Sequence, residues 1–199
     1  MPKAKETGAA PAPAKKTAGR RSYRSYGKIK PAPGKSKAAP KPIKVSFLGG
    51  LNEVGKNMTL FEYGEDMFLV DCGLAFPDQD MLGVDLVLPD FTYVERNADR
   101  IRGIVITHGH EDHIGGLPYL LKVLNVPVYG TKLTIGLIQG KLREHGLLNS
   151  ASLNVIKPGD VITLGGFTVE AIHVNHSIPD ALGLAIRCEG GTIVHTGDF

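Results

Sequence analysis

The sequence predicts an α/β protein in which two β-sheets pack face to face with helices outside them, an αββα layering that follows a long N-terminal tail. Three observations predict it. Strand-like runs occur in two batches, helical segments lie between the batches, and 42% of the 199 residues are apolar, which is enough for one buried core. Strands alternating singly with helices would instead have indicated a doubly wound parallel sheet.

The tail, residues 1–42, differs from the body in composition and charge. It is dominated by Ala, Pro, Lys, Gly and Ser, and it lacks the spaced large apolar residues that could offset the entropy lost on ordering, so we expect disorder. It carries 12 Lys and Arg against one acid, which leaves 11 bases and 19 acids in residues 43–199. The overall charge of +3 therefore combines a tail at +11 with a body at −8.

The tail also interleaves guanidinium groups with aromatic rings. Such a mixture can contact phosphates and stack on the bases of single-stranded nucleic acid, although a solubilising extension is an equal alternative. The residues concerned are Arg20, Arg21, Tyr23, Arg24 and Tyr26.

The first batch of strands begins at Ile43, where the composition changes. Short β-rich runs separated by Gly and Asp turns indicate an antiparallel meander. The runs are residues 43–48, 58–63 and 67–70.

Helical and extended patterns alternate in the middle of the chain, and strands alone follow. Thr131 is a suitable N-cap, and Gly146 a suitable stop, for a helix that reaches about His145. Shorter helical segments are expected at residues 91–98 and 116–124, and apolar strands at residues 103–106 and 127–129. The second batch of strands comprises residues 153–156, 161–164, 167–174, 182–187 and 192–195.

Two cysteines, Cys72 and Cys188, lie far apart without a C-x-x-C partner, which is typical of a reducing compartment. The basic N-terminus has no apolar segment behind it, and no run approaches the ~18 apolar residues that a membrane span needs. We therefore expect a cytoplasmic protein that makes no membrane contact.

The strongest functional signal is residues 107–116, which read THGHEDHIGG between an apolar strand and a helix. Imidazole and carboxylate suit a divalent ion such as Zn²⁺, and a loop at a strand end holds side chains accurately. His108 and His110 can point the same way in an extended chain, whereas Asp112 and His113 are offset. The spacing predicts two metal ions.

Two ions need further ligands from elsewhere in the chain. His176, Asp198 and Asp71 each follow an apolar strand beside Gly or Pro, so they are candidates. His173, inside a strand, and His195, three residues before Asp198, are expected to be core or supporting residues.

With these residues in view, the chain resembles the bacterial ribonuclease J family, in the β-CASP nuclease branch of the metallo-β-lactamase superfamily. The resemblance covers residues 43–199. Its motifs are the strand-end Asp71, FLGGLNEVGKN at 47–57, THGHEDHIGG at 107–116, NHSIPD at 175–180 and HTGDF at 195–199.

The resemblance implies roles for each residue. One metal is held by His108, His110 and His176, the other by Asp112 and His113, and Asp198 bridges them. Asp71 orients the ligand loop, and Asp112 can also orient or deprotonate the attacking water. A hydroxide shared by ions ~3.5–4 Å apart would attack phosphorus in line. The ions would be Zn²⁺ or Mn²⁺.

Residues 49–57 are open to two interpretations. The loop can approach the metals, with Lys56 or Asn57 reaching a substrate phosphate, or it can be a tight turn between the first two strands.

The activity implied is 5′-to-3′ exonuclease and endonuclease cleavage of single-stranded RNA, in rRNA processing and mRNA decay. The family also implies a homodimer and partners in RNA degradation. Family members continue beyond the HTGDF segment with a β-CASP domain and a further metal-ligating His. We therefore expect an N-terminal piece with an incomplete fold, inactive in isolation.

Two alternatives remain open. One is a small-molecule metallohydrolase of the same fold, such as a thioester hydrolase or lactamase. The other is an RNA-binding module without turnover, which could tolerate an empty second metal site.

Overall fold

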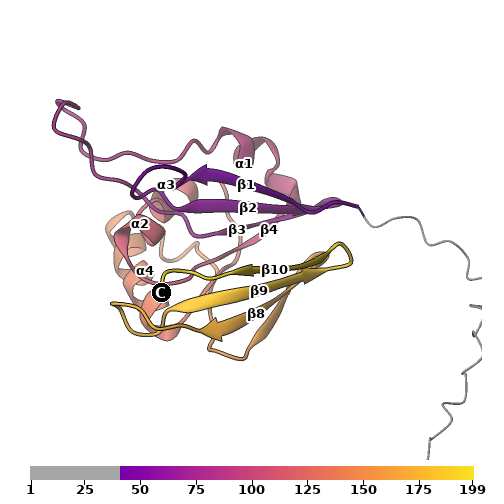
Figure 1. The fold of residues 1–199 in the computed structure, drawn as a ribbon. Helices are drawn as coiled ribbons and strands as arrows, with labels where there is room; N and C mark the ends of the chain where they lie inside the picture. Colours follow the sequence, from indigo (N-terminus) through magenta and orange to yellow (C-terminus); the bar gives the residue numbers. More distant parts are fainter. Residues whose placement is uncertain (1–40) are drawn as a thin grey trace, which may run out of the picture. The chain divides into compact units, whose positions relative to one another are not determined.

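The computed structural model describes residues 41–199, which form two β-sheets and a set of short helices (Figure 1). The tail at 1–40, with its expected disorder and its Arg and Tyr residues, lies outside the described residues. The strands are β1 (Lys44–Gly49), β2 (Met58–Tyr63), β3 (Asp66–Val70), β4 (Ile101–Val105), β5 (Val128–Gly130), β6 (Leu153–Val155), β7 (Val161–Leu164), β8 (Phe167–His173), β9 (Leu182–Cys188) and β10 (Gly191–His195).

The strands form two separate sheets, as predicted, but the division between them differs: β6, expected in the second batch, joins the first sheet by pairing with β5. The first has six strands in the order β1-β2-β3-β4-β5-β6, and the second has four in the order β10-β9-β8-β7. The expected antiparallel meander is present in β1, β2 and β3, and β3 to β6 then pair in parallel. Helical segments separate these parallel strands because a parallel pair needs a crossover connection.

The helices are α1 (Thr92–Arg96), α2 (Glu111–Ile114), α3 (Leu117–Leu120) and α4 (Lys132–Glu144), with a 3₁₀ turn η1 (Ala98–Arg100). The long predicted helix is α4, with Thr131 and His145 at its caps. The Thr131 hydroxyl bonds the Thr134 hydroxyl rather than a backbone N–H. The segment predicted as a helix at 116–124 forms α3 and then hydrogen-bonded turns at 121–123.

The core has two parts, one on each side of the first sheet. Between the sheets, Phe68 stacks on Phe61 at a ring distance of 5.2 Å and meets Phe167 edge-on at 5.0 Å. On the other side, the buried faces of all four helices pack on the first sheet. The described residues thus contain helix, sheet and sheet, the layering expected of an incomplete αββα fold.

Strand ends from both sheets meet at one end of the layered body. β3 ends before Asp71, β4 before Thr107, and β10 before the turn that leads to Asp198. The backbone N–H of Leu182 donates to Thr107 O across the sheets, at 2.9 Å. Figure 1 shows the end of the chain beside α2 and α4 at this place. None of the helices in residues 41–199 has the length and hydropathy of a membrane span.

Candidate metal centre

Asp71 is the buried anchor of the site. It follows β3 with a positive φ of 62°, and its carboxylate accepts from the Thr107 backbone N–H at 2.7 Å. The Thr107 hydroxyl lies 2.8 Å from Asp71 Oδ2, and His113 Nδ1 lies 2.8 Å from the same oxygen. Asp71 therefore ties the end of β4 to α2.

These bonds fix which ring nitrogens face the site. Thr107 has one hydroxyl proton, and donating it to Asp71 leaves its oxygen to accept from His108 Nδ1, 3.0 Å away. His113 donates from Nδ1 to Asp71 in the same way. Both rings then present Nε2 with a free lone pair, the form in which histidine binds a metal.

The charges in this buried group are strongly coupled. Burial opposes the charge of Asp71, but His113 and the Thr107 N–H outweigh it and hold the Asp71 pKa below its usual value. Burial also opposes a charge on His113, yet the Asp71 carboxylate raises the His113 pKa to about 9. Burial, with the nearby His113, lowers the His108 pKa to about 4. A cation at His113 Nε2, whether a proton or a metal ion, is thus compensated by Asp71.

Three imidazoles converge beside this anchor. His108 Nε2 lies 3.0 Å from His110 Nδ1, and His176 Nε2 lies 3.3 Å from the same atom. Nitrogens at Zn–N distances of 2.0–2.1 Å in a tetrahedral site are about 3.3 Å apart. The structure brings these three side chains together, and their spacing fits one divalent ion.

A second group forms on the other side of His108. Ligand atoms of His108, His113 and Asp198 lie within 4.8 Å of one another. Asp198 Oδ2 is 3.3 Å from His113 Nε2 and 4.0 Å from His176 Nε2, so it lies between the two groups. Asp112 belongs to neither group, although its Oδ2 is 3.5 Å from His113 Nε2. This set of donors is compatible with divalent metal binding.

Backbone contacts hold the ligand helix α2 against the segment after β3. Cys72 N donates to His113 O at 2.8 Å, and Asn57 N donates to Asp112 O at 3.0 Å. A β-carbon at Gly73 would overlap the carbonyl of Asp112, so only glycine allows this approach. None of these contacts has a signal in the local sequence pattern.

Residues 49–57 both connect β1 to β2 and reach the site. The Asn57 amide Nδ2 lies 3.1 Å from Asp112 Oδ2 and 3.1 Å from His113 Nε2. Lys56 instead pairs with Glu53 at 2.9 Å. The structure thus places Asn57 against the candidate ligands and the Lys56 ammonium on a neighbouring acid.

The remaining histidines differ from one another. His173 ends β8 and is exposed, so the expectation that it is a core residue is wrong. His195 supports the Asp198 turn, because its Nδ1 accepts from Gly197 N at 3.2 Å and its ring meets Phe61 edge-on. The sequence reasoning missed Thr107, whose position directly before the first histidine was its only signal.

Comparisons with known proteins agree with this geometry. The family described as the metallo-beta-lactamase superfamily matches residues 51–199. Ribonuclease J 1 of Streptococcus pyogenes is 45% identical over 80% of the chain, and ribonuclease J of Synechocystis is 48% identical over 79%. The chain spans only 29% and 25% of those two relatives.

A solved structure shows the same fold. The metallo-beta-lactamase fold protein YhfI from Bacillus subtilis matches with a TM-score of 0.54 and 23% identity, over 79% of this chain and 63% of that one. The predicted fold class and the resemblance to ribonuclease J are both confirmed.

Proposed function

The chain belongs to the metallo-beta-lactamase superfamily, and from that premise we propose that it is the catalytic metal-binding part of a ribonuclease that hydrolyses RNA phosphodiester bonds. The observation that carries the proposal is the convergence of His108, His110 and His176 beside His113 and Asp198. The similarity to ribonuclease J supports the substrate class.

Two divalent ions, Zn²⁺ or Mn²⁺, are proposed for this cluster of side chains. His108, His110 and His176 would hold one, Asp112 and His113 the other, and Asp198 would lie between them. Such a pair of ions supplies an ionised water at neutral pH and neutralises charge that develops on phosphate oxygens.

The side chains themselves perform orienting and proton-transfer work. Asp71 and Thr107 hold the His108 and His113 rings with Nε2 toward the site. Asp112 accepts from Asn57 with one oxygen, which leaves the other to accept a proton from the attacking water. Asp112 and Asp198 are the exposed members of the site, with side chains 38% and 45% exposed, so they face an incoming substrate.

The direction of cleavage and the cellular role belong to the same proposal. We propose 5′-to-3′ exonuclease and endonuclease action in rRNA processing and mRNA decay, in the cytoplasm, on single-stranded RNA. We further propose that the chain is part of a longer protein that dimerises and meets RNA-degradation partners through parts outside this chain. Residues 1–199 alone would then be inactive.

The test is the nuclease activity of the complete protein on a 5′-monophosphorylated single-stranded RNA, with bound metal counted in the same preparation. We expect stepwise release of nucleotides that Asp112→Ala abolishes. Release that persists in Asp112→Ala would contradict the proposed site. Two bound metals without any release would instead favour a small-molecule hydrolase of the same fold.

A matched control separates the site from the fold. Asp160→Ala removes a partly exposed carboxylate at a turn outside both groups of ligand atoms, where it accepts from Lys157 N at 3.0 Å. This variant should retain nuclease activity and metal content. Equal losses in both variants would show that the effect of Asp112→Ala is not specific to the site.

A further inference from the structure

The ligand helix α2 is too short to hold its own position. It has four residues, Glu111–Ile114, whereas isolated helices in water need roughly 12–15 residues to be stable. It carries His113, a member of the second group, and Asp112 beside it, and both are proposed to hold the second ion. Contacts from the rest of the fold must therefore fix its orientation.

One side of α2 is held by the backbone of neighbouring segments. Cys72 N bonds His113 O, Asn57 N bonds Asp112 O, and Leu74 N bonds Glu111 O at 3.3 Å. All three bonds reach carbonyls of α2 from the β1–β2 connection and the segment after β3. They leave the side of α2 toward α4 without a backbone tie.

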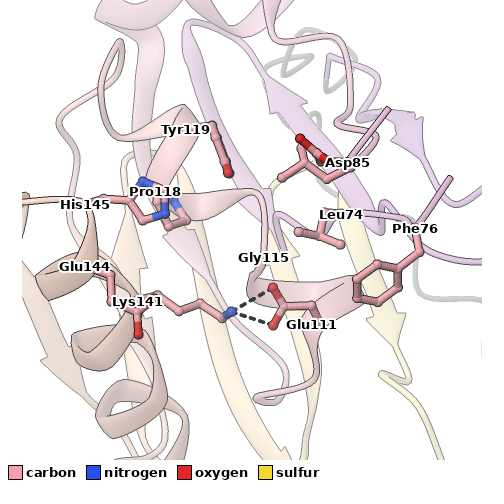
Figure 2. A pocket seen from close by; sticks show the side chains of 11 residues that line it. Leu74, Phe76, Asp85, Glu111, Gly115, Pro118, Tyr119, Lys141, Glu144 and His145 are labelled. Carbon is pink, nitrogen blue, oxygen red and sulfur yellow. Dashed lines mark hydrogen bonds and ion pairs between the residues drawn. The ribbon is translucent and has the colours of Figure 1, made fainter. Parts of the chain in front are cut away.

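That other side borders a cavity. The cavity, about 260 Å³, lies between α2, α3, α4 and the segment after β3, and is lined by Leu74, Phe76, Pro118 and Tyr119 among others (Figure 2). At its edge, Lys141 of α4 extends to Glu111, with Nζ 2.7 Å from Oε1 and 2.5 Å from Oε2. Figure 2 shows this pair bridging the two helices.

A second contact from the same face of α4 lies one helical turn away. Leu137 and Lys141 are four residues apart and so share a face. Leu137 packs on Gly109, where a β-carbon would overlap its Cδ1. Helix α4 thus touches the ligand loop at Gly109 and at Glu111, on either side of His110.

We propose that Lys141 is a positioning residue for the second proposed metal ion: by holding Glu111 it fixes the orientation in which α2 presents Asp112 and His113. The inference rests on the proposed metal centre. Lys141 and Glu111 are partly exposed, with side chains 28% and 38% exposed, and such pairs contribute little to global stability. The consequence of breaking the pair is therefore expected in metal affinity rather than in folding.

The experiment measures Zn²⁺ affinity at both sites of the complete protein by competition with chelators, without any assay of activity. Lys141→Met keeps most of the apolar stem and removes the charge. We expect it to weaken the second Zn²⁺ by about 10-fold, the size of effect seen when groups that support a ligand are removed. The first Zn²⁺ and the melting temperature of the metal-free protein should stay close to wild type.

Three variants serve as controls. Lys141→Arg should restore the second affinity to within about 3-fold, because the cation and its reach are kept. Glu111→Lys combined with Lys141→Glu should recover part of the loss seen with either single change. Arg143→Met removes an exposed cation from the same helix, one that forms no ion pair within residues 41–199, and should change neither affinity.

The outcomes separate this inference from the proposed function. Two bound Zn²⁺ ions with unchanged affinities in Lys141→Met would overturn the inference alone, as would equal effects of Lys141→Met and Arg143→Met. A wild-type protein that binds no Zn²⁺ would overturn the proposed metal centre and the inference together.

Discussion

The candidate site has a buried half and an open half, and the two are built differently. Asp71 and His108 follow β3 and β4 of the first sheet, His113 lies in α2, and all three are almost fully buried. Asp71 bonds His113 directly, and the Thr107 hydroxyl joins Asp71 to His108. His176 and Asp198 come from the loops after β8 and β10 and remain accessible, as does Asp112. The buried half is held by hydrogen bonds among its own side chains, whereas the open half presents its side chains to solvent.

The largest effect is expected at the residue that the two metal groups share. His108→Ala removes a ligand atom from both groups and should lower metal affinity by more than about 100-fold, with loss of nuclease activity. The domain should stay folded, with the far-ultraviolet circular dichroism of wild type. The measurement is metal content per chain after dialysis against a weak chelator.

His145→Ala is the matched control for His108→Ala. His145 caps the end of α4 and its ring meets Tyr119 edge-on at 5.2 Å, outside both groups. The His145→Ala variant should retain the metal content of wild type. Activity that survives in His108→Ala after the metal is gone would contradict the two-metal mechanism.

A pair of isosteric substitutions compares the two halves directly. Asp71→Asn leaves a buried cation at His113 without its counter-charge and should destabilise the metal-free protein by about 3 kcal/mol. Asp198→Asn, in the open half, should change stability by about 0.5 kcal/mol or less while still weakening metal binding. Urea unfolding of the metal-free variants measures both.

Equal free energies of unfolding in the two variants would contradict the distinction between the halves. Retained metal affinity in Asp198→Asn would remove that residue from the proposed ligands. A stabilised Asp71→Asn protein would show that the buried charge is a net cost to the fold.

The reactivity of the two cysteine thiols measures whether solvent and reagents reach the buried half. Cys72 follows Asp71 and is fully buried, and burial together with the Asp71 charge raises its pKa far above that of a free thiol. A raised pKa lowers the fraction of reactive thiolate at pH 8. An aromatic disulfide reagent should therefore label Cys188 in the native protein and Cys72 only with denaturant. Rapid labelling of Cys72 would show that the buried half opens readily.

The smallest effect is expected from the tail, which belongs to neither half. The body at −8 does not attract RNA at long range, so the +11 tail is proposed to supply that attraction. Deleting residues 1–42 should weaken RNA affinity most at low salt, by an amount that shrinks as salt rises. Unchanged affinity at about 50 mM salt would contradict a role for the tail.

The sequence predicted the strands well because their apolar periodicity is local. Every observed strand begins and ends within about two residues of its prediction, and the antiparallel meander is present. The helix predicted at 116–124 is longer than the observed one. Its apolar residues are spaced for a buried helical face, but only α3 forms regular helix. Pro127 disfavours helical backbone at Val126, so a helix could not continue into β5.

The candidate site could be predicted only in part. His108, His110 and Asp112 share one short motif, and His176 and Asp198 follow strands, so their types and positions point to a metal. The roles of Thr107, Asn57 and Lys141 depend on contacts between segments far apart in the chain. No local pattern encodes such contacts, and the fold alone reveals them.

The central claim is that the buried and open halves together hold two divalent ions. Anomalous X-ray diffraction at the zinc edge, from crystals of the complete protein grown with Zn²⁺, tests it most directly. The account predicts two peaks, one among His108, His110 and His176 and one beside His113 and Asp198. A single peak, or peaks remote from these side chains, would contradict it.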